Sequence, residues 1–170
     1  MPRRYEIRPI EPGDKAGLAA AVDESSDEAI YRRFLNPHGR LTAPELRYLT
    51  EVDHRDHEAL VAIDPASGKS VGVARYVRDV ERPHSAEIAV AVLEPWQGGG
   101  IGKALLHRLA DRAGDEGITQ FTGLMLAGNG PMRRLLASLG TPRLVGSDAG
   151  AVELAVDLQP SASPRREKKL

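Results

Sequence analysis

The chain reads Gln97-Gly98-Gly99-Gly100-Ile101-Gly102-Lys103 at the point where a β-rich run gives way to a helical one. Glycines leave backbone N–H groups unobstructed, and a helix N-terminus adds about half a positive charge. The stretch therefore predicts a turn that binds an anion such as a pyrophosphate. The alternative is a glycine-rich turn that only reverses the chain.

Two common phosphate-binding motifs do not match this turn. A Walker loop would need Gly where Gln97 stands, and Ser or Thr where Ala104 follows the lysine. A dinucleotide fingerprint that begins Gly98-x-Gly100 would need a third glycine at the position of Lys103. Neither a P-loop nor a dinucleotide-binding motif is therefore predicted.

The chain after the turn alternates between helix and strand. Apolar residues recur at helical spacing from Leu105 to Ala113, and Gly114 is the predicted stop. Next come a strand near residues 118–126, a helix over residues 130–139, and two strands around residues 143–145 and 151–158. This alternation requires a parallel pair of strands.

The chain before the turn reads as a short strand, three helices and an antiparallel meander. The strand spans residues 5–10. The helices begin after Asp14, which is the predicted cap of residues 15–22, at Ser25 and after Thr42, with capping boxes at the last two. The meander comprises residues 59–63, 71–77 and 86–93. We expect an α/β fold with a mixed sheet covered by helices on both faces.

The turn matches Gln/Arg-x-x-Gly-x-Gly/Ala, with Gln97, Gly100 and Gly102 in the three fixed places, and so resembles the acyl-CoA signature of the GNAT N-acetyltransferases. The order of elements over residues 5–158 also resembles that family. The resemblance implies a mostly antiparallel sheet of six to seven strands with a splayed parallel pair. It also implies one GNAT domain over residues 1–158. The Pro/Ser-rich, basic composition of residues 159–170 predicts a disordered tail.

The resemblance implies acetyl-CoA as co-substrate and assigns residues to it. Gln97 belongs to the signature, and Asn129, which opens a later helix, would contact the pantetheine arm. The backbone of Val90, Ala91 and Val92 would pair with that arm as if it were an added strand. The pyrophosphate would contact the backbone N–H groups of Gly98, Gly99, Gly100, Ile101, Gly102 and Lys103.

Glu87 is the candidate general base, since a lysine amine with a pKa of about 10.4 must lose a proton before it attacks a thioester. Alternation places Glu87 on one strand face with Ala89 and Ala91, where small neighbours leave room for substrate. The stretch Ala86-Glu87-Ile88 resembles the catalytic strand of histone-type lysine acetyltransferases and of the bacterial Pat protein-lysine acetyltransferases. A solvent-facing carboxylate or an ion-pair role is the alternative.

Three positions depart from the family pattern. Gly99 stands where a basic residue is frequent, so either Lys103, Arg133 or Arg134 carries that charge instead, or the cofactor binds more weakly. Leu136 replaces a tyrosine that many members use as general acid, and Leu124 replaces a glutamate of the ribosomal-protein acetyltransferases. Water or another group would then protonate the leaving thiolate.

The amino-acid composition argues against several other classes of protein. The chain has 170 residues, no cysteine, a net charge of −1 and 4% aromatic residues, which argues against disulfides, sulfur-based zinc sites and a dedicated nucleic-acid binder. No signal peptide or membrane-spanning run is visible, and we expect a cytoplasmic monomer or homodimer. His54 and His57 should point to opposite faces, so no metal site is predicted.

We therefore predict an enzyme that moves acetyl from acetyl-CoA to a primary amine by direct attack. A protein lysine is the first candidate acceptor, and a small-molecule amine is the second. A non-catalytic acyl-CoA-sensing domain is the alternative from another class, because the tyrosine and the basic residue at Gly99 are missing.

Overall fold

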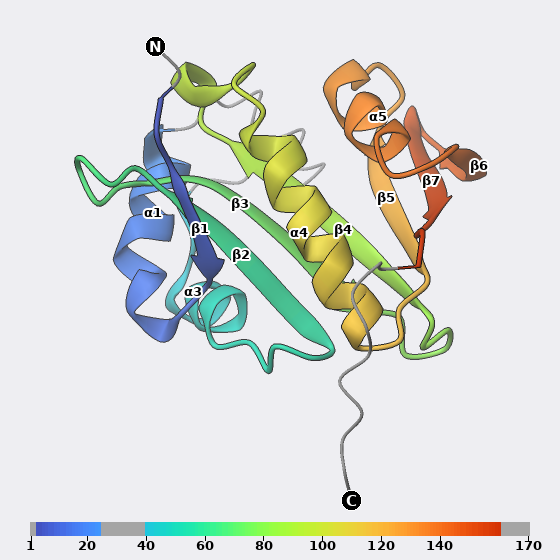
Figure 1. Ribbon diagram of the computed structural model, residues 1–170, viewed down its shortest axis with the longest axis horizontal. Coiled ribbons are helices and arrows are strands. Elements are labelled where there is room, and N and C mark those ends of the chain that lie inside the picture. Colours follow the sequence, from blue (N-terminus) through green and yellow to red (C-terminus); the bar gives the residue numbers. More distant parts are fainter. Residues whose placement is uncertain (1–2, 25–39, 161–170) are drawn as a thin grey trace, which may run out of the picture.

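One seven-stranded sheet organises the chain (Figure 1). The structure is a computed structural model that describes residues 3–24 and 40–160. Strand order is β1-β2-β3-β4-β5-β7-β6, and every neighbouring pair is antiparallel except β4 and β5. This confirms the predicted mixed sheet. The strands are β1 (Glu6–Pro9), β2 (His57–Ile63), β3 (Ser70–Arg78), β4 (Ser85–Val92), β5 (Gln120–Leu126), β6 (Arg143–Asp148) and β7 (Ala151–Asp157).

Helices cover both faces of the sheet, as expected. Gly72 of β3 packs on α4, whereas Arg75, on the opposite face of the same strand, reaches the carbonyl oxygen of Leu49 in α3. The helix predicted to begin at Ser25 lies outside the described residues. The described helices are α1 (Lys15–Glu24), α3 (Ala43–Thr50), α4 (Ile101–Asp115) and α5 (Gly130–Ala137), with short 3-10 helices η1 (Pro12–Asp14) and η2 (Glu94–Trp96).

The main core lies between the sheet and α4. Leu105, Leu106 and Leu109 are fully buried, as their helical spacing predicts, and they meet the equally buried Tyr76 and Phe121 of the sheet. Gly72 permits close packing here, because a Cβ at this position would lie 3.2 Å from side-chain atoms of both Ile101 and Leu105. The buried apolar surface fixes α4 across the middle of the sheet.

Two predictions about helix ends, the stop of α4 and the cap of α1, need correction. α4 continues through Gly114, and its end is closed at Gly117, whose φ of 79° brings the N–H of Ile118 to the carbonyl oxygen of Ala113 (2.9 Å). Asp14 was expected to cap α1, but its carboxylate binds the guanidinium of Arg8 and accepts from the Glu11 N–H at 2.7 Å. Those bonds, the one from Arg8 foremost, hold the pKa of Asp14 below its usual range.

The capping box predicted for α3 is confirmed. The Thr42 hydroxyl accepts from the Glu45 N–H at 3.3 Å, and the Glu45 carboxylate accepts from the Thr42 N–H at 2.7 Å. Both partners satisfy donors that the helix itself leaves without an acceptor. This cap fixes where α3 begins, on the sheet face opposite α4.

The parallel pair splays apart after three positions, forming a fork. Ser85, Ala86 and Glu87 of β4 pair with Gln120, Phe121 and Thr122 of β5, and the printed register ends there. Both strands continue beyond this point, β4 to Val92 and β5 to Leu126. The fork separates a β1–β4 half of the sheet from a β5–β7–β6 half.

The described chain ends shortly after the last strand. Leu158 donates its N–H to the carbonyl oxygen of Thr119 at 2.8 Å, next to the end of β7. Residues 161–170, most of the predicted tail, lie outside the description. No helix within residues 3–24 or 40–160 is long and apolar enough to cross a membrane.

Candidate active site

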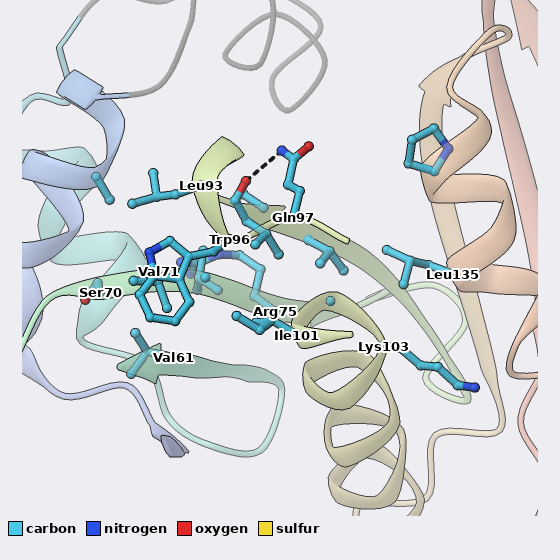
Figure 2. A pocket seen from close by; sticks show the side chains of 18 of the residues that line it. Val61, Ser70, Val71, Arg75, Leu93, Trp96, Gln97, Ile101, Lys103 and Leu135 are labelled. Atoms are coloured by element: carbon cyan, nitrogen blue, oxygen red, sulfur yellow. Dashed lines mark hydrogen bonds between the residues drawn. The ribbon is translucent and has the colours of Figure 1, made fainter. Parts of the chain in front are cut away.

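A cavity of about 600 Å³ opens at the fork (Figure 2). It extends from the glycine turn and the N-terminus of α4, past the diverging end of β4, to the space under α1 and α3. Apolar side chains form most of its wall. Of the predicted site residues it is lined by Val90, Ala91, Val92, Gln97, Gly98, Gly100, Ile101, Gly102, Lys103 and Asn129.

The glycine turn depends on left-handed backbone at two positions. Gly98 and Gly100 have φ values of 79° and 83°, a region that other residues rarely adopt. Gly100 is also the N-cap residue of α4, so the first N–H groups of that helix face the cavity side of the turn. Backbone donors and the helix dipole together make this turn suitable for a phosphate group.

Gln97 has a role that sequence reasoning did not find. Its side-chain Nε2 donates to the carbonyl oxygen of Val92 at 2.9 Å, shown as the dashed line in Figure 2. The bond ties the start of the turn to the end of β4. The Val92 carbonyl, one of the groups predicted to pair with a pantetheine arm, therefore already has a partner.

Trp96 packs at the cavity wall beside the turn. Its ring is half-buried against the core, and the guanidinium of Arg3 lies 4.9 Å from the ring centroid. Arg3 also donates to the carbonyl oxygen of Pro95 at 2.9 Å. The N-terminal segment thus supports the turn from outside, with Trp96 packed beside it.

Asn129 caps α5 and lines the cavity. Its side-chain oxygen accepts from the Met132 N–H at 3.2 Å. With the oxygen engaged in the cap, the amide nitrogen is the group that Asn129 presents to a ligand. The sequence prediction that Asn129 opens this helix is confirmed.

The sequence offers three basic residues as replacements for a cation at Gly99. Lys103 and Arg134 line the cavity, whereas Arg133 turns its Nε toward the carbonyl oxygen of Ala127, 3.2 Å away. Gly99 is exposed and is absent from the cavity wall. Lys103 and Arg134 are therefore the two positive charges best placed for a phosphate.

Glu87 stands at the closed end of the fork. It is the last residue of β4 in register with β5, and its side chain is exposed. Strand alternation places it on the sheet face of Ala89 and Ala91, as predicted, and Ala91 lines the cavity. Glu87 is not itself in the cavity wall, so its catalytic role stays a prediction.

A buried cation forms part of the wall on the α3 side. Arg75, only 5% exposed, donates from Nη1 to the carbonyl oxygen of Leu49 and to Nε2 of His57, each at 3.0 Å. Arginine can only donate, so His57 accepts and is neutral at Nε2. Burial and the nearby Arg75 charge lower the pKa of His57 to about 4. Figure 2 shows Arg75 lying behind Trp96.

The two histidines of residues 53–58 do point to opposite faces. His57 meets Arg75 and the ring of Tyr48, whereas Nδ1 of His54 lies 2.7 Å from the buried carboxylate of Glu58, which also binds Arg112 of α4. Within residues 3–24 and 40–160, no cluster of three or more His, Cys, Asp or Glu could hold a metal ion.

An acyl-CoA arm fits these features. The outer part of β4 has no β5 register beyond Glu87, so its backbone can take an amide-bearing arm as a strand partner. A Cβ at Gly98 or Gly100 would meet nothing within 4 Å, so the turn is open to a ligand. The residues that would hold the arm and its phosphates are those of the fork, the glycine turn and Asn129.

The fold and the site together indicate that the protein belongs to the class of acetyltransferases. The family model described as Acetyltransferase (GNAT) family matches residues 24–141, and the chain belongs to that family. The predicted resemblance to the GNAT family is thereby confirmed.

Two proteins show which members of the family this chain resembles. The chain is 35% identical over 156 residues to the acetyltransferase Pat of Mycolicibacterium smegmatis, covering 92% of this chain and 46% of the relative. It thus spans about half the length of that relative. The GNAT domain of Streptomyces lividans PAT superposes with a TM-score of 0.83 at 31% identity, covering 91% of this chain and 90% of that one.

A second solved structure agrees on the fold. The Salmonella typhimurium protein yncA, whose structure contains its cofactor acetyl-CoA, matches with a TM-score of 0.73 at 22% identity, covering 94% of this chain and 97% of that one. At this identity the match supports the fold alone.

Proposed function

We propose that this chain transfers acetyl from acetyl-CoA to a primary amine, with the side chain of a protein lysine as acceptor. The observation that carries the proposal is the cavity, which connects the glycine turn to the splayed end of β4 in a chain of the GNAT family. The similarity to Pat proteins over nearly the whole chain supports the lysine acceptor over a small-molecule amine.

The acceptor enters from the α1 and α3 side in this proposal. Leu18, Leu49 and Val61 line that part of the cavity and suit the methylene stem of a lysine. The ammonium group must lose its proton near the fork, where Glu87 stands on the same sheet face as Ala91. Acetyl-CoA supplies an activated thioester, and Glu87 accepts the amine proton, directly or through water.

The first experiment is titration calorimetry with acetyl-CoA, followed by a free-thiol assay over lysine peptides and small amines. Binding with thiol release on lysine peptides supports the proposal. Release only on small amines would move the acceptor to that class. Binding without release across the panel would favour a non-catalytic sensor.

The Glu87→Gln variant tests the base. We expect kcat to fall by about 10²- to 10⁴-fold with unchanged acetyl-CoA affinity, because only proton removal is lost. The deficit should shrink toward the pKa of the acceptor amine, where the amine is already neutral. Glu81→Gln, at an exposed position in the β3–β4 turn, is the matched control. Wild-type turnover in Glu87→Gln would remove Glu87 from the mechanism.

A further inference from the structure

A hydroxyl backed by a histidine lies in the cavity wall between α4 and α5. Ser138 follows the last turn of α5 and lines the cavity. Its Oγ lies 2.9 Å from Nε2 of His107, a half-buried residue in the middle of α4, and 2.6 Å from the carbonyl oxygen of Leu135. No residue of this pair belongs to the GNAT signature discussed above.

The bonding pattern fixes where the protons are. The Leu135 carbonyl can only accept, so the Ser138 hydroxyl donates to it and must accept from His107, whose Nε2 therefore carries a hydrogen. The Leu135 carbonyl also accepts from the Ser138 N–H at 3.2 Å. The hydroxyl can consequently turn toward the cavity without leaving that carbonyl without a partner.

The pair lies at the inner end of the site. Asn129 opens α5 beside the glycine turn, and Ser138 is at the other end of the helix. The chain just after Ser138 packs closely on the end of β7, because a Cβ on Gly140 would lie 3.2 Å from the carbonyl oxygen of Asp157. Asp157 in turn pairs with Gln120, which lies at the base of the fork. An arm that begins at the glycine turn and runs into the fork brings its sulfur end toward Ser138.

We propose that Ser138 is a catalytic residue that protonates the leaving sulfur, with His107 supplying the proton to Ser138. This inference rests on the proposed acetyl transfer. The position where many family members have a tyrosine acid is Leu136, which is fully buried and packs on Gly123. Ser138 and His107 provide a proton path that Leu136 cannot.

The proton transfers balance. As the C–S bond breaks, its electron pair stays on sulfur, the Oγ proton of Ser138 passes to sulfur, and the Nε2 proton of His107 passes to Oγ. For this transfer His107 must carry a proton on both ring nitrogens; it is then left neutral, with its hydrogen on Nδ1, and regains a proton from solvent. The ammonium group loses one proton through Glu87 to solvent before the attack and a second one as the C–N bond forms, which leaves a neutral amide nitrogen.

The first test measures a bound product and needs no acceptor. The thiol of CoA bound to the protein is titrated by the ultraviolet absorbance of its thiolate, in wild type, Ser138→Ala and Ser138→Thr. A hydroxyl that donates to the thiolate lowers the thiol pKa. We expect Ser138→Ala to decrease the ionisation constant about tenfold relative to wild type, and Ser138→Thr to restore it. Ser147→Ala, an exposed position on β6, should behave as wild type.

The second test separates hydrogen bonding from proton supply. A glutamine at position 107 can still donate to Ser138 but cannot pass on a proton. His107→Gln should keep the thiol ionisation of wild type while kcat falls, because the hydrogen bond to Ser138 is kept and the proton supply is lost. If CoA binds and all variants share one thiol ionisation constant and one kcat, the relay is wrong while the acetyl transfer stands. If CoA does not bind to the wild-type protein, both the proton relay and the proposed acetyl transfer are wrong.

Discussion

Gly100 shows how one backbone angle prepares the site. Its φ of 83° lets the chain turn directly into α4, so that the helix N-terminus faces the cavity. A side chain in this left-handed region costs about 1–2 kcal/mol. We expect Gly100→Ala to lose that amount of unfolding free energy in urea and to weaken acetyl-CoA binding measured by calorimetry.

Gly99→Ala is the matched control for this prediction. The φ of Gly99 is outside the left-handed region, and the nearest atom to an added Cβ is 3.6 Å away, an ordinary contact. Gly99→Ala should therefore unfold like wild type. Equal losses in the two variants would mean that the left-handed turn is not what Gly100 contributes.

His57 makes stability depend on pH. Burial and the charge of Arg75 lower its pKa from 6.5 to about 4, so between these pH values the unfolded chain binds more protons at this site than the folded one. Its contribution favours folding above pH 6.5 and is lost as pH falls toward 4. The melting temperature of His57→Gln should decline less steeply over this window than that of wild type.

His54→Gln is the comparison for the pH window, since His54 lies on the opposite face and contacts Glu58 instead of Arg75. Melting curves of the three proteins at several pH values would be compared. A wild-type slope that persists in His57→Gln would contradict the assignment to His57.

At the scale of the element, α5 combines a structural cap with a ligand contact in one residue. The oxygen of Asn129 caps the helix, and its amide nitrogen is the proposed contact to the pantetheine arm. Asn129→Asp keeps a capping oxygen and loses the donor, whereas Asn129→Ala loses both. We expect Asn129→Asp to keep wild-type stability but bind acetyl-CoA more weakly. Asn129→Ala should also lose about 1 kcal/mol of unfolding free energy.

Denaturant titration and calorimetry on the same preparations separate the two roles. If Asn129→Asp binds acetyl-CoA as tightly as wild type, Asn129 is a helix cap only. If Asn129→Ala is as stable as wild type, the cap contributes little to α5.

The elements also show which predictions sequence patterns can support. Local signals sufficed for Thr42 and Glu45, whose capping box is a contact between near neighbours, and for the periodic leucines of α4. Gly114 was a wrong stop because a glycine with ordinary φ does not end a helix, and the positive φ of Gly117 depends on the following chain. Asp14 was misassigned because Arg8, six residues earlier, outcompetes the first turn of α1 for its carboxylate.

At the scale of the molecule, contacts between distant segments were invisible in the sequence. Gln97 to Lys103 could be placed by motif, and the fold followed from the order of elements. Arg75 and His107 could not be found, since their partners Leu49, His57 and Ser138 are 18 to 31 residues away and nothing in the spacing marks them. Such side chains become part of a site only after the sheet and helices are assembled.

The sheet is two halves joined at three paired positions, and a ligand in the fork would complete it. Backbone groups at 89–92 of β4 and 123–126 of β5 border the gap, whereas β1, β2 and β3 are paired along their lengths without it. Amide hydrogen exchange reports local opening. With acetyl-CoA we expect slower exchange at 89–92 and 98–103, with little change in β2. Uniform slowing over the whole sheet would instead indicate general stabilisation by mass action, and no slowing at 89–92 would argue against strand-like pairing of the arm with β4.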